Sequence, residues 1–162
     1  MLRRVLTIGA FGFDEETFFK AIVESGADLF CDIRARRGVR GSEYAFVNSA
    51  RLQAGLAARG VRYVHFKDLA PTQDMRDTQY AVDKDAGVAK RKRTELSPEF
   101  AAAYCAGRLE GFDSRGFAAA ALEGATSPVF FCVEREPKAC HRSLVAAKLA
   151  MDLGLPVEDL RP

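Results

Sequence analysis

The sequence lacks a long apolar run. No stretch approaches the roughly 18 consecutive apolar residues of a membrane-spanning helix. The opening segment MLRRVLTIGAFGF has neither the apolar core of about 7–15 residues nor the small-residue cleavage site of a secretory signal. Within it, residues 5–8 have the character of a strand instead. We therefore expect a cytoplasmic protein with no membrane partner.

Cysteine and histidine are scarce as well. Of 162 residues, four are cysteines and two are histidines, and no two cysteines have the CxxC spacing of a zinc ribbon. The four thiols should be reduced in the cytosol. Cys31 and Cys105 fall in apolar strand-like and helix-like segments, so we expect both to be small core residues.

Charge of one sign is not in excess. The chain has 24 basic and 22 acidic residues, a formal net charge of +2, which favours no class of partner. No complete GxGxxG or Walker pattern is present, so the glycines alone do not predict a nucleotide-binding loop. Neither an internal repeat nor a linker divides the chain, which predicts one domain over residues 1–162.

What the sequence does contain is an alternation of strand-like and helix-like segments. RVLTIGA precedes DEETFFKAIVESG, DLFCDIRA precedes NSARLQAGLAARG, and VRYVHFK precedes a long polar segment. In the first helix Asp14 is a candidate N-cap and Gly26 a candidate C-terminal stop. This order predicts a Rossmann-like, three-layer α/β domain with a mostly parallel sheet of about four to five strands flanked by helices.

The second half of the chain continues this alternation after an interruption. Residues 70–95 are polar, only weakly periodic and longer than a typical βα connection, so we expect an irregular surface excursion. Ser97 and Pro98 have the cap and first-turn pattern of a helix that reaches about Leu109. Beyond a helix near residues 114–123, the segment SPVFFCVE is the last clear strand, residues 143–153 form the final helix, and the tail LPVEDLRP is a candidate edge strand.

Polar residues and glycines stand where the predicted strands end. Because the carboxyl ends of parallel strands meet at one rim, where such folds bind ligands, these positions predict a single site. The candidate ligand-binding residues are Gly9, Tyr63, His65, Lys67 and Cys132, and the candidates with a chemical role are Asp32, Arg34 and Glu134. A structural interpretation remains open, with Asp32 and Arg34 as an ion pair and His65 as a structural or surface histidine.

The segment CVEREPKACHRSLVAAKLA places Cys140, His141 and Arg142 together before the last predicted helix. A helix N-terminus and a neighbouring cation favour a thiolate, which makes Cys140 a candidate nucleophile. The alternative is that Cys140 packs inward while Arg142 pairs with acidic neighbours such as Glu134. The wide cysteine spacing and the lack of a clear fourth ligand disfavour metal binding by Cys132, Cys140 and His141, so we predict no metal and no cofactor.

Four motifs occur in order along the chain: LTIG near the start, CDIRARR at the second strand, LAARGVRYVHFKDL through the third, and CVEREPKACHR before the last helix. Together they resemble the family catalogued as domain of unknown function 488, and the C-x-E-x5-C-H-R arrangement is quite specific. The resemblance implies one recurring polar site on a small α/β domain, and it names no reaction. The residues that it assigns to this site are Asp32, Arg34, Glu134, Cys140, His141 and Arg142.

These residues favour an enzyme or binding domain for a small anionic or nucleotide-like ligand. Arg34 and Arg142 would hold phosphate or carboxylate groups, and Cys140 would be the nucleophile of a transferase or hydrolase. The other polar residues would supply a general base and its orienting partner: Asp32, Glu134 and His141. The C-x5-R spacing of cysteine phosphatases is absent, because the residue six after Cys132 is Lys138, so we assign no phosphatase activity.

Two other functions stay open. The basic segments Arg34–Arg40 and Lys90–Arg93 would contact nucleic acid if they lie on one face, although acidic residues flank the second. The protein would then bind or process nucleic acid as an accessory factor. A non-enzymatic interaction module, with a purely structural polar rim, is the third interpretation.

Overall fold

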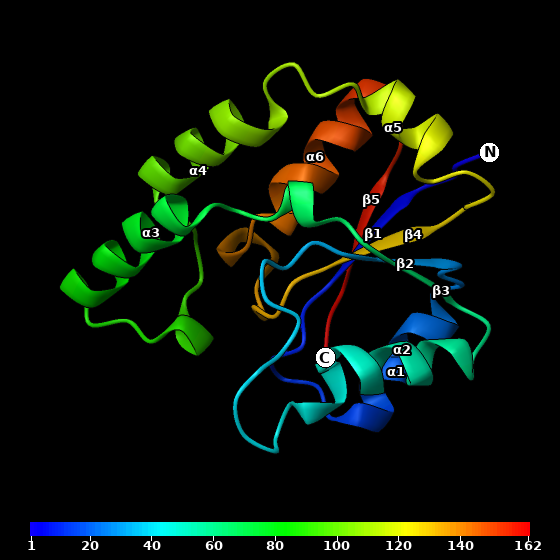
Figure 1. The fold of residues 1–162 in the computed structure, drawn as a ribbon, viewed down its shortest axis with the longest axis horizontal. Helices are drawn as coiled ribbons and strands as arrows, with labels where there is room; N and C mark the ends of the chain where they lie inside the picture. The colour runs from blue at the N-terminus through cyan, green and yellow to red at the C-terminus, as the bar shows by residue number, and fades with distance from the viewer.

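The computed structural model describes all 162 residues, and its centre is a five-stranded, all-parallel sheet with the strand order β3-β2-β4-β1-β5 (Figure 1). The strands are β1 (Val5–Ile8), β2 (Leu29–Asp32), β3 (Arg62–His65), β4 (Pro128–Phe131) and β5 (Val157–Leu160). The prediction of a parallel α/β sheet is confirmed, including the edge strand in the tail.

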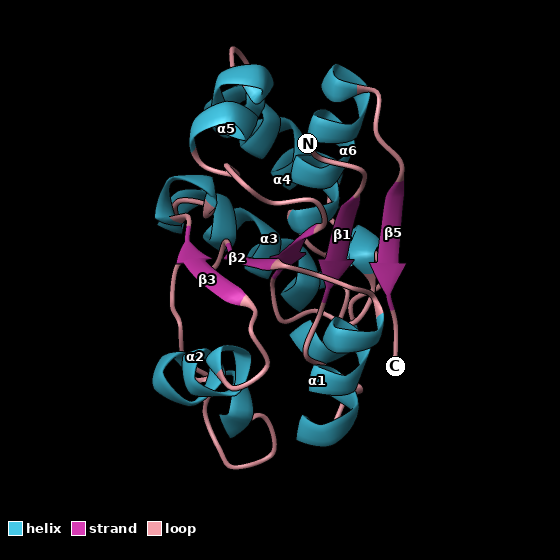
Figure 2. Cartoon of the chain, turned by 90° about the vertical axis from the view of Figure 1, so that its right-hand side faces the viewer, coloured by secondary structure: helices cyan, strands magenta, loops and turns pink.

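Six α-helices flank the sheet. They are α1 (Glu15–Glu24), α2 (Ser49–Ala57), α3 (Gln73–Asp85), α4 (Pro98–Tyr104), α5 (Ser114–Ala120) and α6 (Arg142–Leu153). A π-helical turn at Cys105–Leu109 continues α4. Helices α1 and α2 lie on one side of the sheet and α4, α5 and α6 on the other, which gives the predicted three layers (Figure 2).

Alternating side chains of the short strands supply both cores. In β4, Val129 and Phe131 face the core under α1 and α2, whereas Phe130 faces the core under α4 and α6. The ring of Phe18 from α1 packs edge-on against Phe131, with the ring centres 5.8 Å apart. Because strand residues point alternately to opposite faces, a four-residue strand that is apolar throughout, such as β4, contributes side chains to the cores on both faces of the sheet.

The local signals for helix ends are confirmed. Asp14 accepts a hydrogen bond from the Thr17 backbone N–H at 2.8 Å and caps α1. Ser97 accepts one from the Phe100 N–H at 3.1 Å at the start of α4. Gly26, just beyond α1, has a φ of 69°, a conformation that glycine adopts without steric cost.

Two local predictions were wrong. Residues 70–95 are not an irregular excursion, because they contain the 13-residue helix α3, which packs beside α4 (Figure 1). The few buried positions of α3 are polar, Gln79 and Asp83, so its inner face carries no apolar periodicity. Cys105 is exposed rather than a core residue, whereas Cys31 is buried as expected.

The connections between strands leave a crevice at one edge of the sheet. Ile8 of β1 and Asp32 of β2 both pair with Phe131 of β4, so the three strands end at the same level. The chain leaves β2 towards α2 and leaves β4 towards α6, on opposite faces of the sheet. Adjacent strands whose connections diverge in this way form the ligand-binding crevice of open α/β sheets.

No helix is long and apolar enough to cross a lipid bilayer.

Candidate functional site

A cavity of about 260 Å³ opens at the carboxyl ends of β2 and β4. Its floor comes from the segments that follow these strands and from the start of α6: Arg34, Cys132, Glu134, Cys140 and His141. Its walls come from α3 and the following turn, including Arg76, Gln79, Tyr80, Lys90 and Arg93. Helix α3, which lies in the segment predicted to be irregular, therefore forms one wall of the site.

Asp32 and Arg34 form a buried, bidentate ion pair behind the floor. Arg34 donates from Nε to Asp32 Oδ1 at 2.9 Å and from Nη2 to Asp32 Oδ2 at 2.7 Å. The Tyr63 hydroxyl donates to the same carboxylate at 2.8 Å. The Arg34 guanidinium also lies 4.7 Å from the centre of the Phe131 ring. These contacts fix the plane of the guanidinium.

One nitrogen of Arg34 is left over. Nη1 is buried and has no hydrogen-bond partner, and it is the only buried side-chain nitrogen or oxygen in this situation. Buried polar groups are nearly always satisfied, so an orphan donor on a residue that lines a cavity calls for an explanation. An anionic ligand that accepts from Nη1 would provide one.

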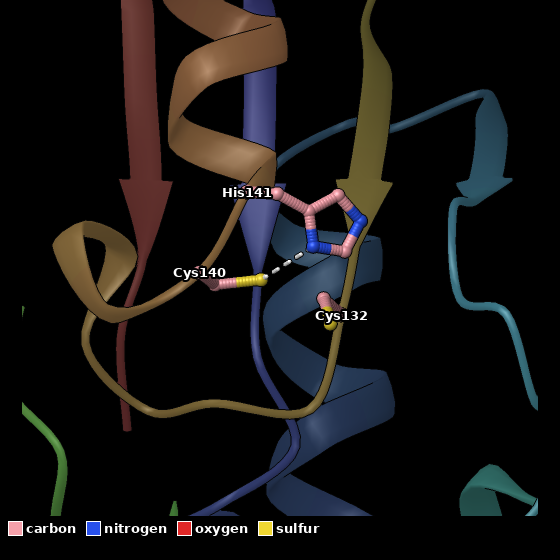
Figure 3. A group of neighbouring side chains, drawn as sticks. All are labelled: Cys132, Cys140 and His141. Carbon is pink, nitrogen blue, oxygen red and sulfur yellow. Dashed lines mark hydrogen bonds between the residues drawn. The ribbon is translucent and has the colours of Figure 1, made fainter. Parts of the chain in front are cut away.

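Cys140 and His141 form a pair at the start of α6 (Figure 3). Cys140 Sγ lies 3.7 Å from His141 Nδ1, and His141 Nε2 lies 3.0 Å from the Ile33 carbonyl oxygen. A carbonyl oxygen only accepts, so Nε2 carries a proton and Nδ1 faces the sulfur. Burial disfavours the imidazolium, but the nearby Cys132 sulfur and the Ile33 carbonyl favour it more, and the pKa of His141 is raised.

Cys132 lies on the same side of the imidazole as Cys140, directly after β4 (Figure 3). Its thiol donates to Glu134 Oε2 at 3.0 Å. The pKa of the Cys132 thiol is well above its ordinary value, because the thiol contacts Cys140, is buried, and lies beside the Glu134 carboxylate. At neutral pH this thiol keeps its proton.

Glu134 is a buried carboxylate held by two cations. Arg93 Nη2 lies 3.1 Å from Glu134 Oε1, and Lys90 Nζ lies 3.7 Å from the same oxygen. Burial alone would raise the pKa of Glu134, but Lys90, the Cys132 thiol and Arg93 together lower it to about 2. Arg93 also donates to Asp83 of α3 at 2.6 Å. One guanidinium thus joins the wall of the cavity to its floor.

Arg142 does not line the cavity. Its guanidinium is fully buried, donates from Nη1 to the Glu134 carbonyl oxygen at 2.6 Å, and donates from Nη2 to the Arg135 carbonyl oxygen at 3.1 Å. Arg142 contacts the backbone of Glu134 and not its carboxylate. Its position ties the loop after β4 to the first turn of α6, and through that loop it sets where Glu134 stands.

Four of the five predicted ligand-binding residues also stand outside the cavity: Gly9, Tyr63, His65 and Lys67. Gly9 lies against the Glu134 carbonyl, where an added Cβ would overlap the oxygen. His65 Nε2 contacts the Arg34 carbonyl oxygen at 2.8 Å, behind the site. Lys67 and His65 line a separate hollow near α5. Of the predicted residues, the cavity brings together Arg34, Cys132, Glu134, Cys140 and His141.

Most residues of the cavity wall were not predicted from the sequence as site residues. Arg36 and Lys90 were noted only as members of basic segments, and both line the cavity. Arg93 ends the run KRKR, which is typical of a solvated cluster, yet its side chain is buried. One local signal could have indicated helix α3: Gln79 and Asp83 are four residues apart, a spacing that places two side chains on the same face of a helix. In the structure the Gln79 amide donates to Asp83 at 2.8 Å.

Comparison with known proteins gives one match. A family model described as "Domain of unknown function DUF488" matches residues 15–149, which include β2, β3, β4 and the whole floor of the cavity. Neither a curated protein nor a solved structure matches the chain.

Proposed function

Because the chain belongs to the DUF488 family, whose description names no activity, we propose on the strength of the site alone that it is an enzyme acting on a small anionic ligand bound in this cavity. Cys132, Cys140 and His141 line the cavity floor, where a bound ligand would meet them. A volume of about 260 Å³ is slightly below the range of about 300–1,000 Å³ for pockets that hold drug-sized ligands, and it suits a ligand of few atoms.

The observation that carries this proposal is the unpartnered Nη1 of Arg34 in a cavity with an excess of positive charge. Five basic residues line the cavity, namely Arg34, Arg36, Arg76, Lys90 and Arg93, against one acidic residue, Glu134. Arg36 and Lys90 are exposed at the cavity and reach solvent. A phosphate or carboxylate group would satisfy Arg34 Nη1 and gain charge-assisted hydrogen bonds from its neighbours.

Binding of inorganic phosphate, measured by isothermal titration calorimetry, tests the proposal. Arg36→Ala removes an exposed cation that lines the cavity, so we expect roughly tenfold weaker binding, as for one charge-assisted hydrogen bond. Arg115→Ala on α5 removes an exposed arginine away from the cavity and should leave the affinity unchanged. Equal losses for both variants, or no binding by the unmodified protein, would refute the proposal.

A second candidate function is nucleic-acid binding. Arg91 forms an ion pair with Glu43 at 2.9 Å, which favours a common face for the segment containing Arg36, Arg37 and Arg40 and the turn Lys90–Lys92. Binding of a labelled oligonucleotide should then weaken steeply with salt, and Arg37→Ala combined with Arg40→Ala should reduce that slope by about two. A slope near zero would leave the cavity as the functional site.

A further inference from the structure

Cys132, Cys140 and His141 bring three metal-binding atoms together on the floor of the cavity. The two Sγ atoms and one imidazole nitrogen all lie within 4.8 Å of one another, and Cys140 Sγ is 3.7 Å from His141 Nδ1. Tetrahedral zinc holds sulfur at about 2.3 Å and nitrogen at about 2.0–2.1 Å, which sets neighbouring ligand atoms about 3.5–3.8 Å apart. The three side chains therefore stand close to the spacing of a metal site (Figure 3).

The orientation of the imidazole is a second, independent observation. The contact of Nε2 with the Ile33 carbonyl oxygen at 3.0 Å keeps the proton on Nε2 and turns the lone pair of Nδ1 towards the sulfur atoms. Metal-binding histidines regularly donate their other ring N–H to a backbone carbonyl or a carboxylate, which fixes the tautomer. The ring of Tyr104, 5.2 Å from that of His141, packs against it from the side of α4. His141 is thus held ready as a ligand through Nδ1.

We propose that Cys132, Cys140 and His141 bind a zinc ion whose fourth position is open to the cavity. Two thiolates and an imidazole favour zinc over magnesium or calcium, which prefer oxygen ligands. All three side chains line the cavity, and three protein ligands with one open position is the arrangement of catalytic zinc. When the metal binds, both thiols release their protons to solvent and the two thiolate charges balance the charge of the ion.

The fold explains why the spacing of the cysteines did not reveal this site. Seven residues separate Cys132 from Cys140, far more than in a CxxC pair. The turn Pro137–Ala139 folds this segment back, and the Cys140 backbone N–H donates to the Pro137 carbonyl at 3.2 Å. Arg142 holds the same loop through the Glu134 and Arg135 carbonyls. The second cysteine is thereby returned to the end of the strand that carries the first.

Glu134 stands beside the proposed metal rather than among its ligands. Its carboxylate contacts Cys132 Sγ at 3.0 Å and is held from the other side by Arg93 and Lys90. Those cations compensate its charge next to a metal-bound thiolate. Only the occupant of the fourth position rests on the proposed function: an anion held by the cavity arginines would reach the zinc, which would polarise it as a Lewis acid.

Zinc binding by the full-length chain tests the inference. Protein stripped of metal with a chelator is titrated with Zn²⁺ in competition with a chromophoric chelator. We expect one zinc per chain, and an affinity reduced more than about 100-fold in Cys132→Ser and in Cys140→Ser, since loss of an outer-shell partner alone costs 10–100-fold. Cys105→Ser, the matched change at an exposed cysteine, should bind as tightly as the unmodified protein. Circular dichroism confirms that each variant is folded.

Two further readouts separate the outcomes. Co²⁺ substituted for zinc should give the intense visible bands of tetrahedral coordination and a sulfur-to-cobalt charge-transfer band, which each cysteine variant weakens. Arg36→Ala should weaken phosphate binding and leave zinc binding intact. Phosphate binding without zinc binding would overturn the metal site and keep the anion site, whereas zinc binding without phosphate binding would do the reverse. Zinc bound equally well by Cys132→Ser would also overturn the inference.

Discussion

Asp32 and Arg34 form a bidentate ion pair at the end of β2, in which two of the three guanidinium nitrogens donate to the carboxylate and the third, Nη1, has no partner. Only one residue, Ile33, separates them along the chain, so the pair is local in sequence but buried in the fold. It fixes the guanidinium of Arg34, whose unpartnered Nη1 supports the proposed anion site. We therefore expect the stability of the protein, and the anion affinity that we propose for the cavity, to depend on this pair.

Asp32→Asn should destabilise the protein strongly. The substitution leaves the buried guanidinium of Arg34 without a counter-charge, which typically costs about 3–5 kcal/mol of unfolding free energy. Glu15→Gln breaks an exposed ion pair with Arg51 and should cost less than about 1 kcal/mol. Urea denaturation of the three proteins gives both values. Similar losses for both variants would show that burial of the Asp32 pair does not matter.

Arg93→Met should loosen the cavity wall. It leaves the buried carboxylates of Asp83 and Glu134 without their shared guanidinium, so α3 loses its main connection to the floor. We expect the amides of α3 to exchange at least about tenfold faster, which corresponds to about 1.4 kcal/mol of local opening free energy. Hydrogen exchange followed by mass spectrometry measures this. Arg91→Met, which removes an exposed ion pair with Glu43, should leave exchange in α3 unchanged.

Gly9→Ala should destabilise the protein although Gly9 has no unusual backbone conformation. The added methyl group would overlap the Glu134 carbonyl oxygen, so β1 or the loop after β4 must shift. Forced overpacking of this kind costs about 1–3 kcal/mol. At Gly38 an added Cβ meets Asn48 only at ordinary contact distance, and Gly38→Ala should change stability by no more than about 0.5 kcal/mol. Thermal unfolding of both variants decides whether the close approach at Gly9 is essential.

Asp28 should contribute stability that depends on pH. Partial burial raises the pKa of its carboxyl, but the Thr126 and Ser127 N–H groups and the Thr126 hydroxyl donate to it, and the net effect lowers the pKa below the ordinary 3.8. A lowered folded-state pKa stabilises the protein above the ordinary value and loses this effect as pH falls through the folded value. Asp28→Asn should therefore cost about 1–2 kcal/mol at pH 7.

The difference in stability between Asp28→Asn and the unmodified protein should shrink as pH falls from about 4 towards the lower folded-state pKa, because Asp28 takes up a proton over this range. Urea denaturation at several pH values between 7 and 3 measures this difference. A difference that stays constant over that range would mean that the charge of Asp28 does not stabilise the junction between β2 and β4.

The sequence by itself determined the architecture, because that information is local and repeated. Four apolar residues in a row, a cap such as Asp14 and a stop such as Gly26 each specify the structure of their own neighbourhood. The alternation of such segments then leaves few arrangements other than a parallel sheet with helices on both faces. The same reasoning placed Asp32, Glu134 and Cys132 at strand ends, since strand ends are themselves local features.

Only the tertiary structure decided which of those residues share the cavity. Arg142 and Arg93 are both arginines in polar segments, yet one holds backbone carbonyls and the other joins α3 to Glu134. Nothing local distinguishes them, because a long side chain reaches whatever the fold brings near it. The meeting of Cys132, Cys140 and His141 likewise depends on how the loop between β4 and α6 folds back. Sequence spacing measures separation along the chain, and the chemistry of this site depends on separation in space.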